Sequence, residues 1–347
     1  MNPGSTLIDS VHPFDKAALG AYLDTHVEKF SGDLIVEQFQ GGQSNPTYRV
    51  SAGGQRYVLR RKPPGKLLPS AHAVEREFRV MSALAGSEVP VAKMVALCED
   101  PGVIGTAFYL MEYVEGRVLW DATLPGLTPT QRAEHYDELN RVIAALHRID
   151  YGAAGLGDFG KPGNYIERQI ARWSKQYHAA AAERIPAMDR LIEWLPLHVP
   201  DGDETTIVHG DYRLDNVIFH ATEPRVLAVL DWELSTLGHP LSDFAYQVMA
   251  WRLAPQEFRG LKGSDFAALG IPTEDEYVAA YCRRTGRTAI PHWEVYLIFN
   301  MFRIAAILHG VLARALQGNA ASQNAVETGS RARLIADIGW EMARRVG

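Results

Sequence analysis

Short apolar or alternating runs, separated by turn residues, fill the first third of the chain and predict β-strands. Gly53-Gly54 has the form of a two-residue hairpin turn between two of these runs. Apolar residues then recur at helical spacing from Val74 to Leu84, which predicts a helix at 71–84. An antiparallel sheet with one inserted helix therefore accounts for the chain up to about residue 113. Its strands are expected at 34–39, 47–51, 56–60, 93–99 and 107–113.

The rest of the chain has its apolar residues mostly at helical spacing. One helix is predicted at 129–149, and another is expected to begin at Asn164, because Asn is a favoured N-cap residue. Two short β-like runs, at 205–208 and 226–230, interrupt this helical region, and the chain from about Ser242 is again mostly helical. The whole pattern predicts an α+β protein whose second part is larger and mostly helical.

The composition is that of an ordinary globular protein, since 47% of the 347 residues are hydrophobic and 22% are charged. The net charge of −6 gives no electrostatic attraction to DNA or RNA, so we expect no nucleic-acid partner. Cys98 and Cys282 are too few for a disulfide framework and suit a reducing compartment. No leader segment is visible, and polar residues interrupt the apolar stretch at 298–316, which predicts a buried helix. The sequence therefore predicts a cytoplasmic protein without a membrane partner, and it leaves the oligomeric state open.

The residues most specific for chemistry form the segment His209-Gly-Asp-Tyr-Arg-Leu-Asp-Asn216. Asp211 follows a predicted strand and opens a loop, a position from which a carboxylate can reach a substrate hydroxyl. For Asp211 alone, a loop or capping carboxylate is the alternative. Asn216 and Asp231, next to β-like runs, offer the oxygen ligands that Mg²⁺ prefers. Because Mg²⁺ completes its coordination with phosphate oxygens in such sites, the combination points to phosphoryl transfer.

This spacing resembles the catalytic loop of kinases, in which an Asp is followed five residues later by an Asn and then by a metal-binding Asp on the next strand. The segment at 231 is Asp-Trp-Glu, and no Ala-Pro-Glu follows it. The chain is therefore unlike protein kinases and resembles the aminoglycoside phosphotransferase and choline kinase family. The resemblance covers roughly residues 30–250 and implies a two-lobed protein-kinase-like fold. It implies a nucleotide-binding lobe at 1–113 with a hinge at its end, and a catalytic and substrate lobe at 114–347.

The same resemblance assigns a glycine-led turn to the phosphates of a nucleotide. Glycines let backbone amides approach phosphate oxygens, and polar side chains add donors. The residues concerned are Gly41, Gly42, Ser44 and Asn45. A plain β-turn is the alternative for this segment.

In the family, a strand lysine contacts the α- and β-phosphates and pairs with a glutamate of the following helix. Arg60 takes the lysine position here, with Glu77 as the expected partner and Glu75 as a rival. Strand alternation places Arg60 and Lys62 on one face and Arg61 on the other. Arginine keeps the positive charge and can bind phosphate in bidentate fashion, although its fork needs a geometry different from that of lysine.

Three further roles follow from the resemblance. Backbone groups from Glu112 to Val114 are expected to hydrogen-bond adenine while Met111 packs against the ring, with an edge strand as the alternative reading. Asp243 matches an Asp that braces the catalytic loop, in a segment where His239 replaces the family's first Asp, and a helix-capping carboxylate is the alternative. Arg213 occupies the position at which protein kinases hold a phosphate-contacting lysine, and it is our second candidate catalytic residue after Asp211, with a merely solvated side chain as the alternative.

Other reaction classes have no motif here, because the chain lacks G-x-x-x-x-G-K-[ST], H-E-x-x-H, C-x-x-C and G-x-S-x-G. Several stretches, among them Gly-Gly-Gln-Ser-Asn-Pro-Thr-Tyr, resemble the kinase-like domain that precedes some acyl-CoA dehydrogenases. This makes hydroxylated acyl groups or hydroxyacyl-CoA candidate acceptors. Polycationic aminoglycosides fit less well, since they call for an acidic cleft. Candidates to line the acceptor pocket, with core packing as the alternative, are Trp251, Trp293, Arg303 and His309.

The sequence therefore predicts a kinase that uses ATP (or GTP) and Mg²⁺ to phosphorylate a hydroxyl group of a small-molecule substrate. A nucleotide-binding scaffold without transfer activity is one alternative, motivated by the arginine at position 60. An aminoglycoside-type antibiotic kinase is another. A protein kinase is disfavoured because the chain has no activation segment.

Overall fold

The structure is a computed structural model that describes residues 7–8, 14–28, 30, 32–39, 45–65, 72–317 and 324–347. Contacts within the chain divide it into two compact units. Unit 1 consists of Met1–Leu119, Gly152–Leu156 and Leu214–Ser235, and unit 2 consists of Trp120–Tyr151, Gly157–Arg213 and Thr236–Gly347. The chain passes between the units several times, so a single cut does not separate them. The assignment of nucleotide binding to 1–113 and of catalysis to 114–347 stays a prediction.

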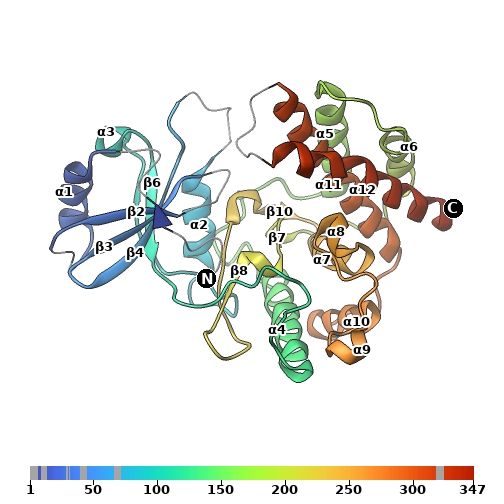
Figure 1. The fold of residues 1–347 in the computed structure, drawn as a ribbon, viewed down its shortest axis with the longest axis horizontal. Helices are drawn as coiled ribbons and strands as arrows, with labels where there is room; N and C mark the ends of the chain where they lie inside the picture. The colour runs from blue at the N-terminus through green and yellow to red at the C-terminus, as the bar shows by residue number, and fades with distance from the viewer. Residues whose placement is uncertain are drawn as a thin grey trace. The chain divides into compact units, whose positions relative to one another are not determined.

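Unit 1 is built on an antiparallel sheet with the strand order β1-β2-β3-β4-β6-β5 (Figure 1). Its strands are β1 (Leu7–Ile8), β2 (Ile35–Phe39), β3 (Thr47–Ala52), β4 (Gln55–Arg61), β5 (Met94–Cys98) and β6 (Phe108–Glu112). Apart from β1, each was predicted to within one residue at either end. Gly53 and Gly54 have φ values of 55° and 79°, as the predicted hairpin turn requires.

Helices cover the two faces of this sheet. On one face, Leu19 and Leu23 of α1 (Lys16–His26) pack with Tyr57 and Leu59 of β4 in one buried cluster. Because side chains alternate along a strand, Arg60 of β4 points to the opposite face. There α2 (Val74–Leu84), the predicted helix, lies against the sheet (Figure 1). Unit 1 also contains the short helix α3 (Pro101–Ile104).

A second hairpin, β8 (Val217–Phe219) with β9 (Val226–Val229), also belongs to unit 1. It lies against the chain that follows β6, because a Cβ atom at Gly116 would come 2.3 Å from the carbonyl oxygen of Phe219. The N–H groups of Arg117 and Phe219 donate to each other's carbonyls at 2.7 and 2.8 Å. The hairpin is flanked by the short 3₁₀ turns η3 (Leu214–Asn216) and η4 (Trp232–Leu234). The predicted metal ligands Asn216, at the end of η3, and Asp231, directly before η4, therefore belong to the same unit as Arg60.

Unit 2 is mostly helical, with one two-stranded sheet of β7 (Thr206–Val208) and β10 (Thr236–Gly238). The predicted helix at 129–149 and the strands at 205–208 and 226–230 are confirmed within two residues. The helices are α4 (Pro129–His147), α5 (Tyr165–Ala179), α6 (Pro186–Trp194), α7 (Pro240–Val248), α8 (Pro255–Phe258), α9 (Phe266–Leu269), α10 (Glu274–Thr285), α11 (Trp293–Leu316) and α12 (Ala325–Val346). Two 3₁₀ turns complete the unit, η2 (Leu195–Leu197) and η5 (Met249–Arg252).

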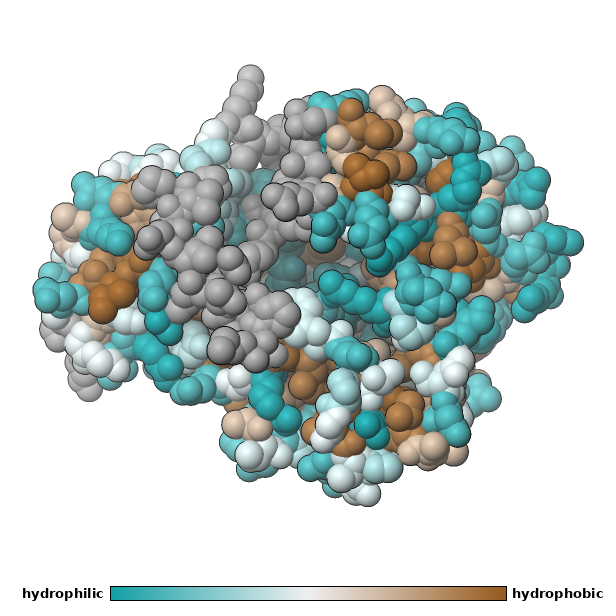
Figure 2. Space-filling view, viewed as in Figure 1, coloured by the Kyte–Doolittle hydropathy of each residue, from teal (hydrophilic) through white to brown (hydrophobic). Residues whose placement is uncertain are grey.

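Helix α11 forms the centre of unit 2 and packs along α12 (Figure 1). It is long and apolar enough, by length and composition, to cross a membrane, but 78% of its most apolar window is buried within the protein. This agrees with the buried helix predicted at 298–316. Figure 2 shows hydrophobic residues on the drawn face as separate patches among hydrophilic ones.

Helix α5 begins where it was predicted to begin, but the expected side-chain cap by Asn164 does not form. Asn164 does stand directly before the first helical residue, but its backbone is left-handed, with φ 47°, and its side chain makes no capping bond. A side-chain cap needs an extended backbone at that position. The N–H of Asn164 instead donates to the carboxylate of Asp203 at 3.1 Å, so this end of the helix is fixed from another loop.

Candidate active site

Arg60 is surrounded by three carboxylates in unit 1. Its Nε lies 3.0 Å from Glu77 Oε2, and its Nη2 lies 2.8 Å from Asp231 Oδ1 and 3.3 Å from Glu233 Oε2. The Arg60 side chain is 14% exposed and that of Glu77 only 2%. The expected pair of Arg60 with Glu77 therefore forms. Glu233, which the sequence did not single out, is a third acid on the same guanidinium.

The Glu77 carboxylate is held by neutral donors as well as by Arg60. Tyr109 Oη donates to Oε2 at 3.1 Å, and Asn45 Nδ2 donates to Oε1 at 2.9 Å. Burial raises the pKa of Glu77, while Arg60 and these two hydrogen bonds act in the opposite direction. Asn45 was expected to donate to phosphate, but its side chain is buried and committed to Glu77.

We expect Arg60→Met to lower the melting temperature strongly, because it leaves the buried Glu77 without its cation. Breaking a buried ion pair from one side costs about 3–5 kcal/mol. Arg60→Lys is the matched control, since it keeps the charge and loses only the forked contact with Asp231 and Glu233. Thermal unfolding of the three proteins measures the effect. Equal losses in the two variants would show that the charge on Arg60 does not stabilise unit 1.

The neighbours of Arg60 confirm the predicted alternation along β4. Lys62 Nζ lies 2.9 Å from Glu75 Oε2. Glu75, the other candidate partner of Arg60, therefore pairs with Lys62 on the face toward α2. Arg61 points to the other face, where its Nε donates to Thr106 Oγ1 at 2.9 Å and its guanidinium lies 5.1 Å from the centre of the Phe14 ring. Only Arg60 of these three cations contacts Asp231 in the part of the chain that the structure describes.

Asn216 and Asp231 lie at adjacent ends of the β8–β9 hairpin, because Leu230 N donates to Asn216 O at 2.8 Å. Their oxygens are the hard donors that Mg²⁺ prefers, and the Asp231 side chain is 34% exposed. Asp231 also has the left-handed φ of 64°, which is uncommon outside glycine and is tolerated best by Asn and Asp. Among the described residues, no group of three or more His, Cys, Asp or Glu is arranged to hold a metal. The pair therefore fits Mg²⁺ as a partial ligand set that needs further oxygens.

The predicted hinge lies at the end of β6. Met111 is buried, whereas Glu112 is exposed and its N–H donates to Lys93 O at 2.9 Å. The N–H of Val114 makes no hydrogen bond within the described part of the chain, so it is available to a ligand. Of the glycine-led turn, Gly41, Gly42 and Ser44 lie outside the described residues.

Asp211 lies in unit 2, between β7 and the first residues of η3, with a side chain that is 18% exposed. Arg213 binds both of its oxygens, with Nε 3.0 Å from Oδ1 and Nη2 3.2 Å from Oδ2. Tyr246 Oη also donates to Oδ1. The two predicted catalytic residues are therefore in contact. Tyr246 was missed, although its place one turn after Asp243 on a predicted helix was a usable signal.

The loop before Asp211 is held by Asp243, as the family resemblance implied. The N–H groups of His209 and Gly210 donate to its two oxygens at 2.7 and 2.8 Å, and His147 Nε2 lies 3.2 Å from Oδ2. Burial alone would raise the pKa of Asp243, but His147 and the bonds from His209 outweigh it and lower the pKa. His209 Nδ1 accepts the N–H of Asp211, so the His209 ring also braces the loop.

His239 caps helix α7, which carries Asp243. Its Nδ1 accepts the N–H of Leu241 at 3.3 Å, which requires that this nitrogen carry no proton. Burial lowers the pKa of His239 to about 4, with the Glu204 carboxylate opposing the shift and Arg287 adding to it. The histidine that replaces the family's first Asp therefore acts as a neutral cap.

We expect this cap to make the fold sensitive to acid. The unfolded chain binds a proton on His239 below about pH 6.5, whereas the folded chain resists doing so until about pH 4. The stabilisation is thus complete above about pH 6.5, the pKa of histidine in the unfolded chain, and it is lost as the pH falls to about 4, the pKa of His239 in the folded chain. His239→Asn keeps a capping oxygen without titrating, so its melting temperature is expected to fall less between these values. The exposed His178→Asn is the control, and equal pH dependence in all three proteins would contradict the assignment.

The four candidates for the acceptor pocket have different surroundings. Arg303 Nη2 donates to Gly210 O at 2.6 Å, next to Asp211. Trp251 donates to Pro272 O and stacks against Tyr277, and His309 Nε2 lies 2.9 Å from Glu183 O, so both belong to the core of unit 2. Trp293 Nε1 donates to Glu274 Oε1 at 2.9 Å. Of the four, only Arg303 contacts the catalytic loop among the described residues.

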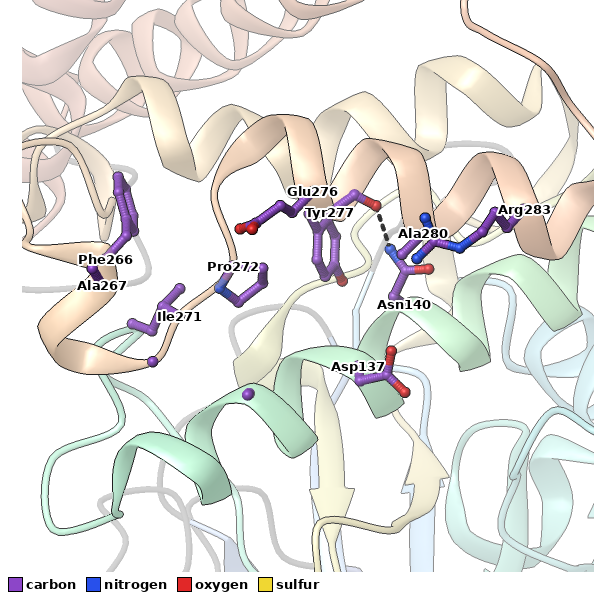
Figure 3. Close-up of a pocket in the computed structure, with 12 residues that line it drawn as sticks. Asp137, Asn140, Phe266, Ala267, Ile271, Pro272, Glu276, Tyr277, Ala280 and Arg283 are labelled. Carbon is purple, nitrogen blue, oxygen red and sulfur yellow. Dashed lines mark hydrogen bonds between the residues drawn. The ribbon is translucent and has the colours of Figure 1, made fainter.

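A cavity of about 410 Å³ opens in unit 2 between α4 and the segment from α9 to α10 (Figure 3). Apolar side chains and Asp137, Asn140, Glu276 and Arg283 line it, and Asn140 donates across it to Tyr277 O. None of the predicted site residues is among its lining residues. The cavity is therefore not the predicted catalytic site.

Comparison with curated proteins gives relatives over nearly the whole chain. It is 48% identical over 342 residues to acyl-CoA dehydrogenase family member 10 of Mus musculus, covering 98% of this chain and 31% of that protein. It is 43% identical over 343 residues to acyl-CoA dehydrogenase family member 11 of Rattus norvegicus, covering 96% and 44%. The chain thus spans less than half the length of these curated relatives.

Solved structures give the same fold. A candidate aminoglycoside phosphotransferase from Ralstonia eutropha is 59% identical, with 96% of this chain and 99% of that chain covered and a TM-score of 0.89. Choline kinase from Cryptosporidium parvum, at 14% identity, covers 96% and 97% with a TM-score of 0.62. Aminoglycoside phosphotransferase APH(4)-Ia, solved in ternary complex with AMP-PNP and hygromycin B, is 18% identical, covers 93% and 98%, and has a TM-score of 0.60.

These likenesses confirm the predicted kinase-like fold, with an antiparallel N-terminal sheet and a largely helical C-terminal part. The sequence model of the phosphotransferase enzyme family matches residues 35–298, which is most of the chain. The predicted resemblance to aminoglycoside phosphotransferases and choline kinases is confirmed with it. This chain belongs to the phosphotransferase enzyme family.

Proposed function

We propose that the protein uses ATP (or GTP) and Mg²⁺ to phosphorylate a hydroxyl group of a small molecule. The observation that carries the proposal is the arrangement of Asp211. Its carboxylate is oriented by Arg213, on a loop whose N–H groups are fixed by Asp243. A positioned carboxylate of this kind orients an acceptor hydroxyl and takes its proton as the phosphoryl group is transferred.

The other residues supply binding and charge. Asn216 and Asp231 would hold Mg²⁺, which when bound neutralises the negative charge on the phosphate oxygens. Arg60 contributes positive charge to the phosphates, with the turn of Gly41, Gly42 and Ser44, and Glu77 holds Arg60 in place. The N–H of Val114, which has no hydrogen-bond partner among the described residues, fits an adenine or guanine edge beside Met111. Arg213 keeps Asp211 oriented and adds a cation for the transferred phosphate.

The acceptor that we propose is a hydroxyacyl compound or its coenzyme A thioester. One observation supports this class. The longer relatives are named as acyl-CoA dehydrogenase family members.

A screen for acceptor-dependent ATP consumption tests the proposal. The purified chain is incubated with Mg-ATP and hydroxy acids, hydroxyacyl-CoA thioesters, choline or aminoglycosides, and products are identified by mass spectrometry. We expect ADP and a phosphorylated hydroxyacyl product, both formed about 1,000-fold more slowly with Asp211→Asn. Phosphorylation of aminoglycosides alone would establish the antibiotic-kinase alternative instead.

A nucleotide-binding scaffold without transfer activity is the second candidate, and one observation favours it. Arg60 is already bound by Glu77, Asp231 and Glu233, so nucleotide phosphates must compete with these carboxylates for its guanidinium. Thermal stabilisation by Mg-ATP without consumption in the presence of any acceptor would establish the scaffold.

We further propose a cytoplasmic location, which the buried free thiols of Cys98 and Cys282 suit.

A further inference from the structure

Tyr246 lies directly against the catalytic carboxylate. It belongs to α7, its side chain is almost fully buried, and its Oη donates to Asp211 Oδ1. Burial and the negative charge of Asp211 raise the pKa of the Tyr246 phenol, so it keeps its proton and acts as a donor. Asp211 therefore accepts hydrogen bonds from a neutral donor as well as from Arg213.

The position of this phenol is fixed from two sides. The guanidinium of Arg303 lies 5.2 Å from the centre of the Tyr246 ring, and the same arginine donates to Gly210 O at 2.6 Å. One buried side chain of α11 thus holds both the tyrosine ring and the residue that precedes Asp211. On α7 itself, Asp243 binds the N–H groups of His209 and Gly210 one turn before Tyr246.

We propose that Tyr246 is a positioning residue that holds the Asp211 carboxylate in a fixed plane for the acceptor hydroxyl. The hydrogen bond from Tyr246 fixes Oδ1, and Arg213 contacts both carboxylate oxygens. The inference deepens the proposed phosphotransferase function and depends on it for its catalytic meaning. The hydrogen bond itself is independent of that function.

Polar and charged residues from three elements surround Asp211 and its loop, and a test of Tyr246 must leave their charges unchanged. Arg213 and His209 belong to its own loop, Tyr246 and Asp243 to α7, and Arg303 to α11. Tyr246→Phe removes one oxygen and leaves the ring in place beneath Arg303. The variant leaves the charges of all these residues unchanged. A change at the Asp211 carboxylate is then attributable to the lost hydrogen bond.

The first measurement does not need an acceptor. The protein is labelled with ¹³C at the aspartate carboxyl groups, and Asp211→Asn identifies the Asp211 signal by its disappearance. We expect the carboxyl chemical shift of Asp211 to change in Tyr246→Phe at constant pH, because the hydrogen bond to its Oδ1 is lost. Tyr296→Phe is the control, since the Tyr296 hydroxyl makes no hydrogen bond with other described residues.

The second measurement is kinetic and uses the acceptor identified by the screen. We expect kcat of Tyr246→Phe to fall about 10- to 100-fold, with KM for ATP nearly unchanged. An unmoved Asp211 carboxyl signal overturns the proposal, whatever happens to kcat. A lower kcat with an unmoved signal and a reduced melting temperature would show a merely structural role. A moved signal without phosphorylation of any acceptor supports the positioning and rejects the proposed function.

Discussion

Asp211→Asn is expected to lower kcat by about 1,000-fold while leaving the affinity for Mg-nucleotide within about twofold. Asparagine has nearly the same shape, but its amide cannot accept the proton of an acceptor hydroxyl. The nucleotide affinity is preserved because the predicted nucleotide contacts, such as Arg60 and Val114, belong to unit 1. Initial rates with the acceptor from the screen give kcat, and calorimetry with a non-hydrolysable ATP analogue gives the affinity.

Asp201→Asn, an exposed aspartate of the same unit, is the control for this experiment and should behave as the wild type. The melting temperatures of both variants are compared first, because Asp211 also pairs with Arg213. Turnover of Asp211→Asn within about tenfold of the wild type would show that this carboxylate does not accept the proton.

The second large effect is expected at Asp231. Asp231→Asn should weaken binding of Mg-ATP by about 100-fold or more, since even changes to the outer partners of a metal ligand cost about 10- to 100-fold. Asparagine is the informative substitution because it tolerates the left-handed backbone at this position, where φ is 64°. Asp231→Ala would add backbone strain to the loss of the carboxylate.

The design separates the metal from the phosphates. In the wild type, Asp231 holds Arg60 Nη2 at 2.8 Å and so competes with any phosphate for that guanidinium. Asp231→Asn removes this competitor, so affinity for ATP measured in EDTA should stay constant or increase while affinity in Mg²⁺ falls. Titrations of both proteins by calorimetry in the two buffers provide the comparison. Equal losses with and without Mg²⁺ would indicate that Asp231 does not bind the metal.

The strands of unit 1 were predictable because their signals are local. Alternating residues and the Gly53-Gly54 turn specify β3 and β4 without reference to distant parts of the chain. The same alternation separated Arg60 from Arg61 correctly. By contrast, the placement of the β8–β9 hairpin in unit 1 involves its close approach to Gly116, which no local pattern reports.

The candidate site was predictable where a motif fixed the spacing and was missed where contacts depend on packing. Asp243 was expected to brace the loop and does so. Glu233 reaches Arg60 only because its turn packs against the site, so no spacing rule indicated it. For Tyr246, the spacing of one turn from Asp243 was a usable signal, but its contact with Asp211 depends on the packing of α7. Asn45 has the right residue type for a phosphate donor, yet burial directs its amide to Glu77. The roles of these residues in binding and transfer stay predictions.

The position of the β8–β9 hairpin in the sequence has a consequence for the order in which the protein folds. During synthesis the ribosome completes residues 1–119 long before it reaches Leu214–Ser235, which belong to the same compact unit. Unit 1 is therefore incomplete until a segment that follows much of unit 2 has been synthesised. Until then Arg60 can pair with Glu77 but not with Asp231 or Glu233. Co-translational folding of this chain is thus expected to finish its first-made unit late.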